Sequence, residues 1–311
     1  MPAPAIELKH VSKAYRGRFR ADRVPALSDV SFEVPAGQIC GFLGPNGAGK
    51  TTSIGLMMGF HGADAGEIRV LGHAPGDVRA KAQIGFLPES FAFYTYLTAP
   101  KLLGLHLALA GRRSSQDLGR ISELLAKVRL DGRERLRIGK YSRGMVQRLG
   151  LAQALVADPQ LVILDEPTSG LDPAGRKETL EVLRALKEEG KTVFLSSHIL
   201  PEVEQICDHV VIIDRGRVVR AGRLREILNT SDRVELVVDR IPEEIERAAA
   251  AHGATVEHGP DRVRIVLDPA GKRELTEALW AAGCNVLSIT PLKNSLEAVF
   301  LKEVAGQKEE S

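Results

Sequence analysis

The segment Gly44-Pro45-Asn46-Gly47-Ala48-Gly49-Lys50-Thr51 decides how the chain is organised. It fits the pattern G-x-x-x-x-G-K-[ST], and it stands between an apolar strand pattern and a helical pattern, which is the context of a phosphate-binding loop. Glycines let backbone N–H groups turn around phosphate oxygens, and the following helix N-terminus adds free donors and partial positive charge. We therefore predict a nucleotide phosphate site rather than a chance glycine-rich turn. The motif alone does not separate kinases, GTPases, motors and transport ATPases.

A second chemical motif lies more than a hundred residues later. Residues 161–166 read Leu-Val-Ile-Leu-Asp-Glu, an apolar strand that ends in two carboxylates. With a phosphate loop in the same chain, Asp165 is expected to hold the Mg²⁺ shell, and Glu166 to polarise the attacking water as a general base. Lys50 is expected to reach the β- and γ-phosphates, and the Thr51 hydroxyl to ligate Mg²⁺. Taken alone, the acidic pair would be compatible with an ordinary strand end.

Further segments follow in a characteristic order and spacing. They are Ser142-Arg143-Gly144-Met145, Gln147-Arg148-Leu149, Ser169-Gly170-Leu171-Asp172 and Ser197-His198. Together with the two motifs above, they make about residues 4–225 resemble the ATP-binding cassette of ABC transporters. The resemblance implies ATP and Mg²⁺ as cofactors. It also implies a head-to-tail dimer, in which the segment 142–144 of one subunit completes the ATP site of the other.

The resemblance also assigns roles to single residues. It implies Glu166, His198 and Lys50 as catalytic residues, with His198 contacting the γ-phosphate and holding the attacking water. Asp172 would couple the two sites across the dimer. The expected metal ligands are Thr51, Glu89 and Asp165. The expected ATP-binding residues are Tyr15, which would stack on adenine, Gly44, Pro45, Asn46, Gly47, Ala48, Gly49, Lys50, Thr51, Thr52, Ser142 and Gly144. Taken singly, Ser142 also fits a plain helix N-cap, and Tyr15 or His198 an ordinary strand end.

The sequence departs from the family pattern at two places. Tyr141, Arg143 and Met145 replace the Leu, the first Gly and the Gln of the usual Leu-Ser-Gly-Gly-Gln signature. Arg143 then either points to solvent or adds positive charge near the partner's nucleotide. Glu89 stands where the family has a glutamine that touches Mg²⁺ or the lytic water. A glutamate accepts hydrogen bonds and ligates Mg²⁺ but donates none as an amide does, and a simple loop carboxylate remains the alternative.

Composition narrows the function classes. The chain has 311 residues, so we expect about two domains. Its net charge is +2 and aromatic residues make up 5%, which argues against a nucleic-acid partner bound through bulk charge or base stacking. The three cysteines show no metal-ligand spacing and are expected to be reduced thiols. The N-terminus shows no signal-peptide pattern and no apolar run reaches membrane-spanning length, so we expect a separate chain to cross the membrane.

We predict an α/β fold made of two domains. Residues 1–230 are expected to form a P-loop NTPase cassette with an antiparallel β subdomain and a helical subdomain at about 96–157. After a linker at Asn229-Thr230-Ser231, the β-α-β-β-α-β order predicts a small α+β ferredoxin-like domain over 231–311, with a last helix at 295–304. Within it, Trp280 is expected in the core beside Leu275 and Leu279. The end of this domain resembles the C-terminal extension of ATP-binding subunits that serve type 2 exporters.

The favoured function is a cytoplasmic ATPase subunit of an ABC exporter. It would act as a homodimer of cassettes, peripheral on the inner face of the cell membrane through a separate transmembrane permease. A soluble ABC ATPase with a non-transport role is the alternative. A purely regulatory module conflicts with the presence of a full catalytic set.

The roles of two surface features remain open. The arginines at 16, 18, 20 and 23 suit a solvated loop or a contact with lipid headgroups or an acidic permease loop. Five aromatic residues gather at Phe86, Phe91, Phe93, Tyr94 and Tyr96, and apart from Phe86 they are expected to dock a permease helix.

Overall fold

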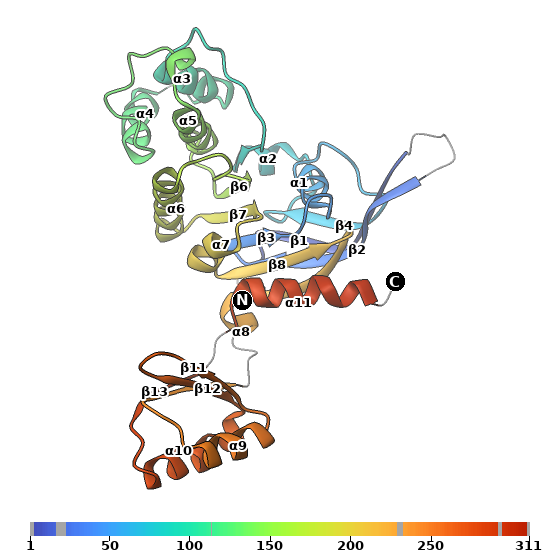
Figure 1. Cartoon of the computed structure of the whole chain (residues 1–311). Coiled ribbons are helices and arrows are strands. Elements are labelled where there is room, and N and C mark those ends of the chain that lie inside the picture. Colours follow the sequence, from blue (N-terminus) through green and yellow to red (C-terminus); the bar gives the residue numbers. More distant parts are fainter. Residues whose placement is uncertain (1–2, 17–22, 113, 229–232, 292–293, 310–311) are drawn as a thin grey trace. The chain divides into compact units, whose positions relative to one another are not determined.

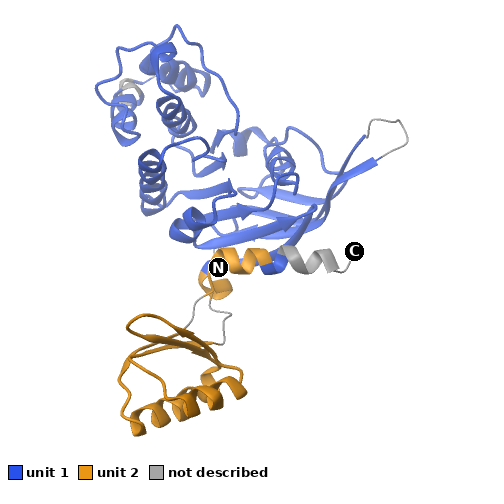
Figure 2. Ribbon diagram, viewed as in Figure 1, with its two compact units in different colours: residues 1–224, 302–311 blue, residues 225–301 orange. Residues whose placement is uncertain are grey.

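The computed structural model describes residues 3–16, 23–112, 114–228, 233–291 and 294–309 (Figure 1). The chain forms two compact units, which we call the cassette unit (residues 1–224 and 302–311) and the accessory unit (residues 225–301) (Figure 2). This division differs from the predicted one at 230, because it falls a few residues earlier and returns the end of the last helix to the cassette unit. The predicted linker at 229–231 and the arginines 18 and 20 lie outside the described residues.

A six-stranded sheet forms the centre of the cassette unit, in the order β5-β6-β7-β3-β8-β9. Its strands are β3 (Ile39–Leu43), β5 (Ile84–Leu87), β6 (Leu161–Asp165), β7 (Thr192–Ser197), β8 (His209–Asp214) and β9 (Arg217–Arg223). All pairings are parallel except that of β8 with β9. Every residue of β3, β6 and β7 is buried, as expected for parallel strands covered by helices on both faces. The predicted α/β fold is confirmed.

A second, three-stranded antiparallel sheet packs beside the first. Its order is β2-β1-β4, with β1 at Ile6–Arg16, β2 at Arg23–Val34 and β4 at Ala65–Val70. Phe32 of this sheet packs against Phe42 and Phe194 of the central sheet, with ring centroids 5.6 Å and 6.3 Å apart. The two sheets therefore share one hydrophobic core, and the predicted antiparallel subdomain is present.

Helices complete the cassette unit. They are α1 (Lys50–Met57), α2 (Val78–Lys81), α3 (Ala99–Leu109), α4 (Ser115–Lys127), the 3₁₀ turn η1 (Ile138–Lys140), α5 (Arg143–Leu155), α6 (Pro173–Glu188) and α7 (Leu200–Ile206). The segment from α3 to α5 contains helices but no strand among its described residues, as its sequence predicts. The start of α4 is fixed by a capping box between Ser114 and Asp117, whose hydrogen bonds lower the pKa of the Asp117 carboxyl. Among the described residues, no helix has the length and apolar character required to traverse a bilayer.

The accessory unit has the predicted β-α-β-β-α-β order. After the short helix α8 (Leu224–Leu228), its elements are β10 (Val234–Val238), α9 (Glu243–Ala251), β11 (Thr255–His258), β12 (Val263–Leu267), the 3₁₀ turn η2 (Pro269–Gly271), α10 (Lys272–Ala281) and β13 (Val286–Pro291). The sheet order β11-β12-β10-β13 is antiparallel throughout. That order is the ferredoxin-like arrangement. The last helix, α11 (Leu296–Glu309), is longer than predicted.

The predicted core position of Trp280 is wrong. Leu275 and Leu279 of α10 are buried in the accessory core, whereas Trp280 is 61% exposed. Leu275 and Leu279 are four residues apart and lie on one helix face, while Trp280 follows Leu279 by one residue, a rotation of about 100° around the helix. The side chain therefore leaves the face that packs on the sheet.

Candidate nucleotide site

A cleft of about 440 Å³ lies at the carboxyl ends of the parallel strands β3, β6 and β7. Because parallel strands end at the same sheet edge, the segments that follow them meet there. The cleft is lined by Ala26, Pro45, Asn46, Gly47, Gly49, Lys50, Thr51, Thr52, Glu89, Asp165, Glu166, Ser169 and His198. The structure thus brings together the predicted phosphate loop, acidic pair, Glu89 and His198, although they are far apart in the sequence.

The phosphate loop has a backbone that requires glycine at two positions. Gly47 and Gly49 have φ angles of +80° and +107°, in the left-handed region that side chains rarely adopt. A Cβ at Gly49 would also lie 2.8 Å from the carbonyl oxygen of Ala26. Helix α1 begins directly after Gly49 without a side-chain cap among the described residues, so its first backbone N–H groups remain available for an anion.

Lys50 supplies the positive charge of this loop. Its side chain is almost fully buried, and Nζ donates to the carbonyl oxygens of Gly44 at 2.6 Å and Pro45 at 3.3 Å. The ammonium group is therefore held over the loop by the loop's own backbone, on the wall of the cleft. A cation in this place can neutralise phosphate oxygens cradled by the N–H groups of α1.

The acidic pair is organised by a residue that the sequence analysis did not single out. Ser196, fully buried on β7, donates its Oγ hydrogen to Asp165 Oδ1 at 2.5 Å. Ser196 Oγ also accepts a hydrogen bond from the backbone N–H of Glu166 at 3.0 Å. Glu166 has a φ angle of +51°, which is strained for a residue other than glycine. Strained backbone of this kind clusters at functional sites, and here it follows directly on the last residue of β6.

Glu166 and His198 form a pair on the cleft wall. The distance from His198 Nδ1 to Glu166 Oε2 is 2.8 Å. The glutamate is buried, whereas the histidine side chain is 57% exposed. A buried carboxylate that is oriented by an imidazole and opens on a polar cleft has the geometry of a general base.

The oxygen donors of the cleft fit a Mg²⁺ ion. Mg²⁺ prefers oxygen ligands and commonly takes one or two from the protein, the others coming from water and substrate phosphates. The Thr51 hydroxyl, the Asp165 carboxylate and the Glu89 carboxylate all line the cleft beside the phosphate loop. Asp165 Oδ1 accepts from Ser196, and Ser196 thereby fixes the orientation of the carboxylate.

Six other predicted site residues do not line this cleft: Tyr15, Gly44, Ala48, Ser142, Gly144 and Asp172. Gly44 and Ala48 belong to the phosphate loop, whereas the other four lie outside it. Ser142 is the N-cap of α5, where its Oγ accepts from Met145 N at 3.3 Å. Asp172 is the N-cap of α6 and accepts from Gly175 N at 2.9 Å. Within one subunit, both residues therefore have a local role at the beginning of a helix.

Tyr15 lies near the end of β1 and is 38% exposed. Its ring meets the edge of His61 with centroids 6.1 Å apart, and Lys13 Nζ lies 5.7 Å from the ring centre. Stacking of this ring on adenine stays a prediction. Conversely, Ala26 and Ser169 line the cleft although neither is predicted as a site residue. Ala26 carries no charge and no motif position, whereas Ser169 begins the segment 169–172, in which only Asp172 has a predicted role.

Arg143 is not fully described by the solvent alternative, and a place near the partner's nucleotide stays a prediction. The residue is exposed, yet its guanidinium rests on the backbone of Gly170, where an added Cβ would lie 2.4 Å from Arg143 Cζ. The side chain therefore does not extend freely into solvent. It contacts the segment 169–172 of its own chain.

Comparison with known proteins agrees with this site. The family profile described as ABC transporter matches residues 27–169. An uncharacterised ABC transporter ATP-binding protein of Synechocystis is 35% identical over 97% of this chain and 85% of its own length. A second one, from Bacillus subtilis, is 36% identical over 96% of this chain and 99% of its own. The Nod factor export ATP-binding protein I of Rhizobium etli is 33% identical over 98% of this chain and 95% of its own.

Solved structures give the same answer. The ATP-binding subunit of an ABC transporter is 33% identical, with a TM-score of 0.63 over 72% of this chain and 91% of its own. A dimeric ATP-binding cassette in a post-hydrolysis state, bound to ADP and Pi, is 26% identical, with a TM-score of 0.64 over 71% of this chain and 99% of its own. With the phosphate loop, the acidic pair and the histidine at one cleft, the chain belongs to the ABC transporter family as an ATP-binding subunit with ATPase chemistry.

Proposed function

We propose that this chain hydrolyses MgATP as one half of a cassette homodimer and thereby powers export through a separate transmembrane permease. The observation that carries the proposal is the cleft that gathers Lys50, Asp165, Glu166 and His198 around the phosphate loop. It contains a cation for the phosphates, a carboxylate for the metal shell and a second carboxylate for the water. These are the parts that phosphoryl transfer to water requires.

In the proposed reaction, each residue of the cleft has a role that follows from its position. Glu166 accepts a proton from the water that attacks the γ-phosphorus, and His198, 2.8 Å from that carboxylate, helps to orient the water. Lys50 and the first amides of α1 stabilise the negative charge on the phosphate oxygens. Mg²⁺, when bound by Thr51, Asp165 and Glu89, supplies further charge neutralisation.

We propose the homodimer because two helix N-termini with predicted site residues lie outside the subunit's own cleft. Ser142 and Gly144 stand at the N-terminus of a 13-residue helix, and Asp172 at that of a 16-residue helix, yet neither end faces the subunit's own cleft. A helix N-terminus favours an anion. In a head-to-tail dimer, the end of α5 would face the γ-phosphate of the partner's ATP, and Asp172 would lie between the two sites. The dimeric form of a solved cassette structure supports this arrangement.

A permease contact is proposed for the aromatic cluster after β5. Phe91 and Phe93 are half-buried with ring centroids 5.1 Å apart, while Tyr94 and Tyr96 are largely exposed. Phe91, Phe93 and Tyr94 are therefore at least partly exposed, as a contact with a permease helix requires. Phe91 also fills the space beside Gly150 of α5, where a Cβ would lie 2.6 Å from its ring. A helix that docks on the segment 91–96 would thus meet a segment that also contacts α5 through Phe91.

Export and membrane attachment through a permease are supported by relatives named for Nod factor export. The alternative, a soluble ABC ATPase outside transport, shares the same cleft and differs in its partner.

We further propose that residues 1–230 carry the ATP chemistry and that the ferredoxin-like region over 231–311 has an accessory role, because every residue of the cleft precedes residue 200.

The Glu166→Gln variant tests the proposed reaction. An amide cannot accept the proton from water, so we expect ATP turnover to fall on the order of 10²–10⁴-fold. ATP binding should persist, and ATP should convert the variant into a stable dimer visible by size-exclusion chromatography. Lys50→Ala serves as the contrast, because it should lose ATP affinity by removing the phosphate cation. Normal turnover in Glu166→Gln would refute the role of this carboxylate. Co-purification of the wild-type chain with a permease from detergent-solubilised membranes separates export from the soluble alternative.

A further inference from the structure

The first two turns of α5 contact one continuous segment that runs from the end of β6 into α6. Arg143 rests on Gly170, and a Cβ at Gly144 would lie 3.5 Å from Leu171 Cδ2. Gln147 Nε2 donates to the carbonyl oxygen of Pro167 at 3.0 Å. The N-terminal end of α5 is therefore packed against the chain that leads to the N-terminal end of α6.

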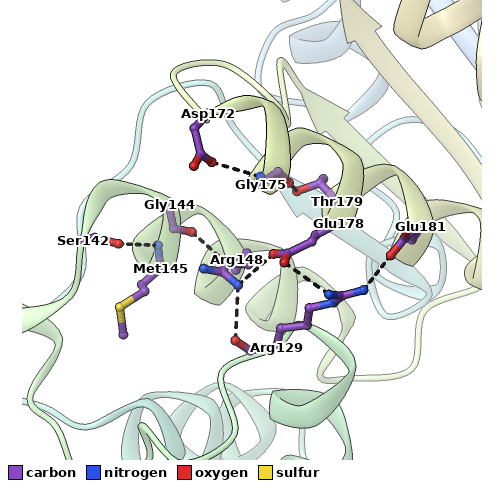
Figure 3. A network of polar contacts seen from close by, with 10 residues as sticks. All are labelled: Arg129, Ser142, Gly144, Met145, Arg148, Asp172, Gly175, Glu178, Thr179 and Glu181. Carbon is purple, nitrogen blue, oxygen red and sulfur yellow. Dashed lines mark hydrogen bonds and ion pairs between the residues drawn. The ribbon is translucent and has the colours of Figure 1, made fainter.

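Arg148 adds an ionic contact between the same two helices (Figure 3). Its Nη1 lies 3.1 Å from Glu178 Oε2 on α6 and donates to the carbonyl oxygen of Arg129 at 3.3 Å. Its Nε donates to the carbonyl oxygen of Gly144 at 3.4 Å. The side chains of Arg148 and Glu178 are 22% and 27% exposed. One guanidinium thus links the signature segment, the end of α4 and the second turn of α6.

A second arginine completes the network. Arg129 Nη1 lies 3.2 Å from Glu178 Oε1, and its Nη2 lies 2.6 Å from Glu181 Oε2. Glu178 therefore faces two cations, whereas Glu181 faces one and does not contact Arg148. Arg129 is exposed, so its ion pairs are screened by solvent more than the pair of Arg148 with Glu178. In the network of Figure 3, Arg148 belongs to α5, Glu178 and Glu181 belong to α6, and Arg129 follows α4. The same view includes Ser142 and Asp172, the N-caps of α5 and α6.

We infer that the Arg148–Glu178 ion pair is a positioning contact that holds the Ser142 end of α5 and the Asp172 end of α6 in a fixed relation, so that both meet the partner subunit together. The inference rests on the proposed homodimer. Helix ends can serve a shared nucleotide only if their spacing is set before the subunits meet, because a misplacement of about 1 Å weakens such a site severely. The pair touches neither the cleft nor any cleft residue among those described, so it would act through the two helix ends.

A purely structural role makes a different prediction from a positioning role. Loss of a partly exposed ion pair from the fold alone would lower the stability of each subunit and leave the dimer of folded subunits unchanged. Glu181→Gln is the matched control. It removes a carboxylate from the same helix, one turn later, and breaks an ion pair with Arg129 but not with Arg148.

The experiment measures ATP-dependent dimerisation by analytical ultracentrifugation in the Glu166→Gln background. We expect Glu178→Gln to weaken association about tenfold, or ~1.4 kcal/mol shared by two symmetric sites, and Glu181→Gln to weaken it less than about twofold. Binding of a fluorescent ATP analogue to the monomer and the melting temperature should match between the two variants. Arg148→Gln should weaken association as Glu178→Gln does, and the double variant should be no weaker than either single one.

Three results would overturn the positioning role. The first is unchanged association in both Glu178→Gln and Arg148→Gln. The second is an equal loss of association in Glu181→Gln. The third is a loss of association that follows the melting temperature across all variants. A Glu166→Gln protein that remains monomeric with ATP would instead refute the proposed homodimer itself, and the inference would fail with it.

Discussion

Replacing Ser196 by alanine should damage both the stability and the chemistry of the cassette unit. The Ser196 hydroxyl is fully buried, donates to Asp165 Oδ1 at 2.5 Å and accepts from Glu166 N at 3.0 Å. Alanine removes a single oxygen and leaves the volume nearly unchanged. The substitution therefore reports on these two hydrogen bonds rather than on packing.

The expected magnitude follows from the two groups left behind. A hydrogen bond to an ionised carboxylate contributes about 1.5–3 kcal/mol, and a neutral one about 1 kcal/mol, more when its buried partner stays unsatisfied. For Ser196→Ala we expect a loss of about 3 kcal/mol in the free energy of unfolding. Ser197→Ala is the control, because Ser197 is also buried and accepts one bond, from Ile199 N at 3.0 Å. It should cost about 1 kcal/mol.

Urea unfolding followed by far-UV circular dichroism is the suitable assay. The single tryptophan, Trp280, belongs to the accessory unit, so its fluorescence would report on the wrong part of the chain. With a urea m-value of roughly 3 kcal/mol/M, the midpoint of Ser196→Ala should fall by about 1 M. ATP turnover should fall as well, since Asp165 and Glu166 lose their shared partner. A midpoint equal to that of Ser197→Ala, with normal turnover, would show that Ser196 does not organise the acidic pair.

Two more predictions concern the surface and the thiols. Replacing Phe93 and Tyr94 by Ala should abolish co-purification with the permease and leave the ATPase activity of the isolated subunit within about twofold. The reason is that loss of exposed aromatic anchors weakens an interface more than it weakens a fold. Unfolding of the double variant would contradict the docking role. Burial raises the pKa of Cys40 to about 12 and also raises that of Cys207, so only about 10⁻⁴ of Cys40 is thiolate at pH 8. Both thiols should resist a disulfide reagent until urea unfolds the protein. The stabilising contribution of the raised Cys40 pKa is complete below about pH 9 and is lost as pH rises toward 12. Rapid native labelling of either thiol would contradict their burial.

The local parts of the site could be predicted from the sequence because each is a short motif with its own chemistry. Most of the phosphate loop lines one cleft together with Asp165, Glu166 and His198. The sheet order β5-β6-β7-β3-β8-β9 could not be read from the chain, since strand neighbours depend on crossovers that leave no local pattern. The strand order of the accessory sheet is easier to predict from the sequence, because the β-α-β-β-α-β order restricts the topology strongly.

Residues that act through the backbone or through a distant partner escaped prediction. Ser196 was missed because a serine at the end of an apolar strand carries no signal of the carboxylate on the neighbouring strand that it contacts. Ala26 contributes to the cleft by its position alone. Trp280 departs from the usual burial of large apolar residues because its angle around α10 turns it away from the face of Leu275 and Leu279.

The departure at Arg143 has a structural counterpart at Gly170. An added Cβ at Gly170 would lie 2.4 Å from Arg143 Cζ, so the exposed guanidinium would have to move to make room for a side chain there. The backbone there also has a φ angle of +71°, which glycine adopts at least cost. The Arg143 guanidinium thus takes the space beside the bare backbone of Gly170, and its charge stays at the surface next to the segment 169–172. In the proposed dimer, this places a cation of one subunit at the surface that faces the partner's phosphates, where it would favour association with ATP over association without nucleotide.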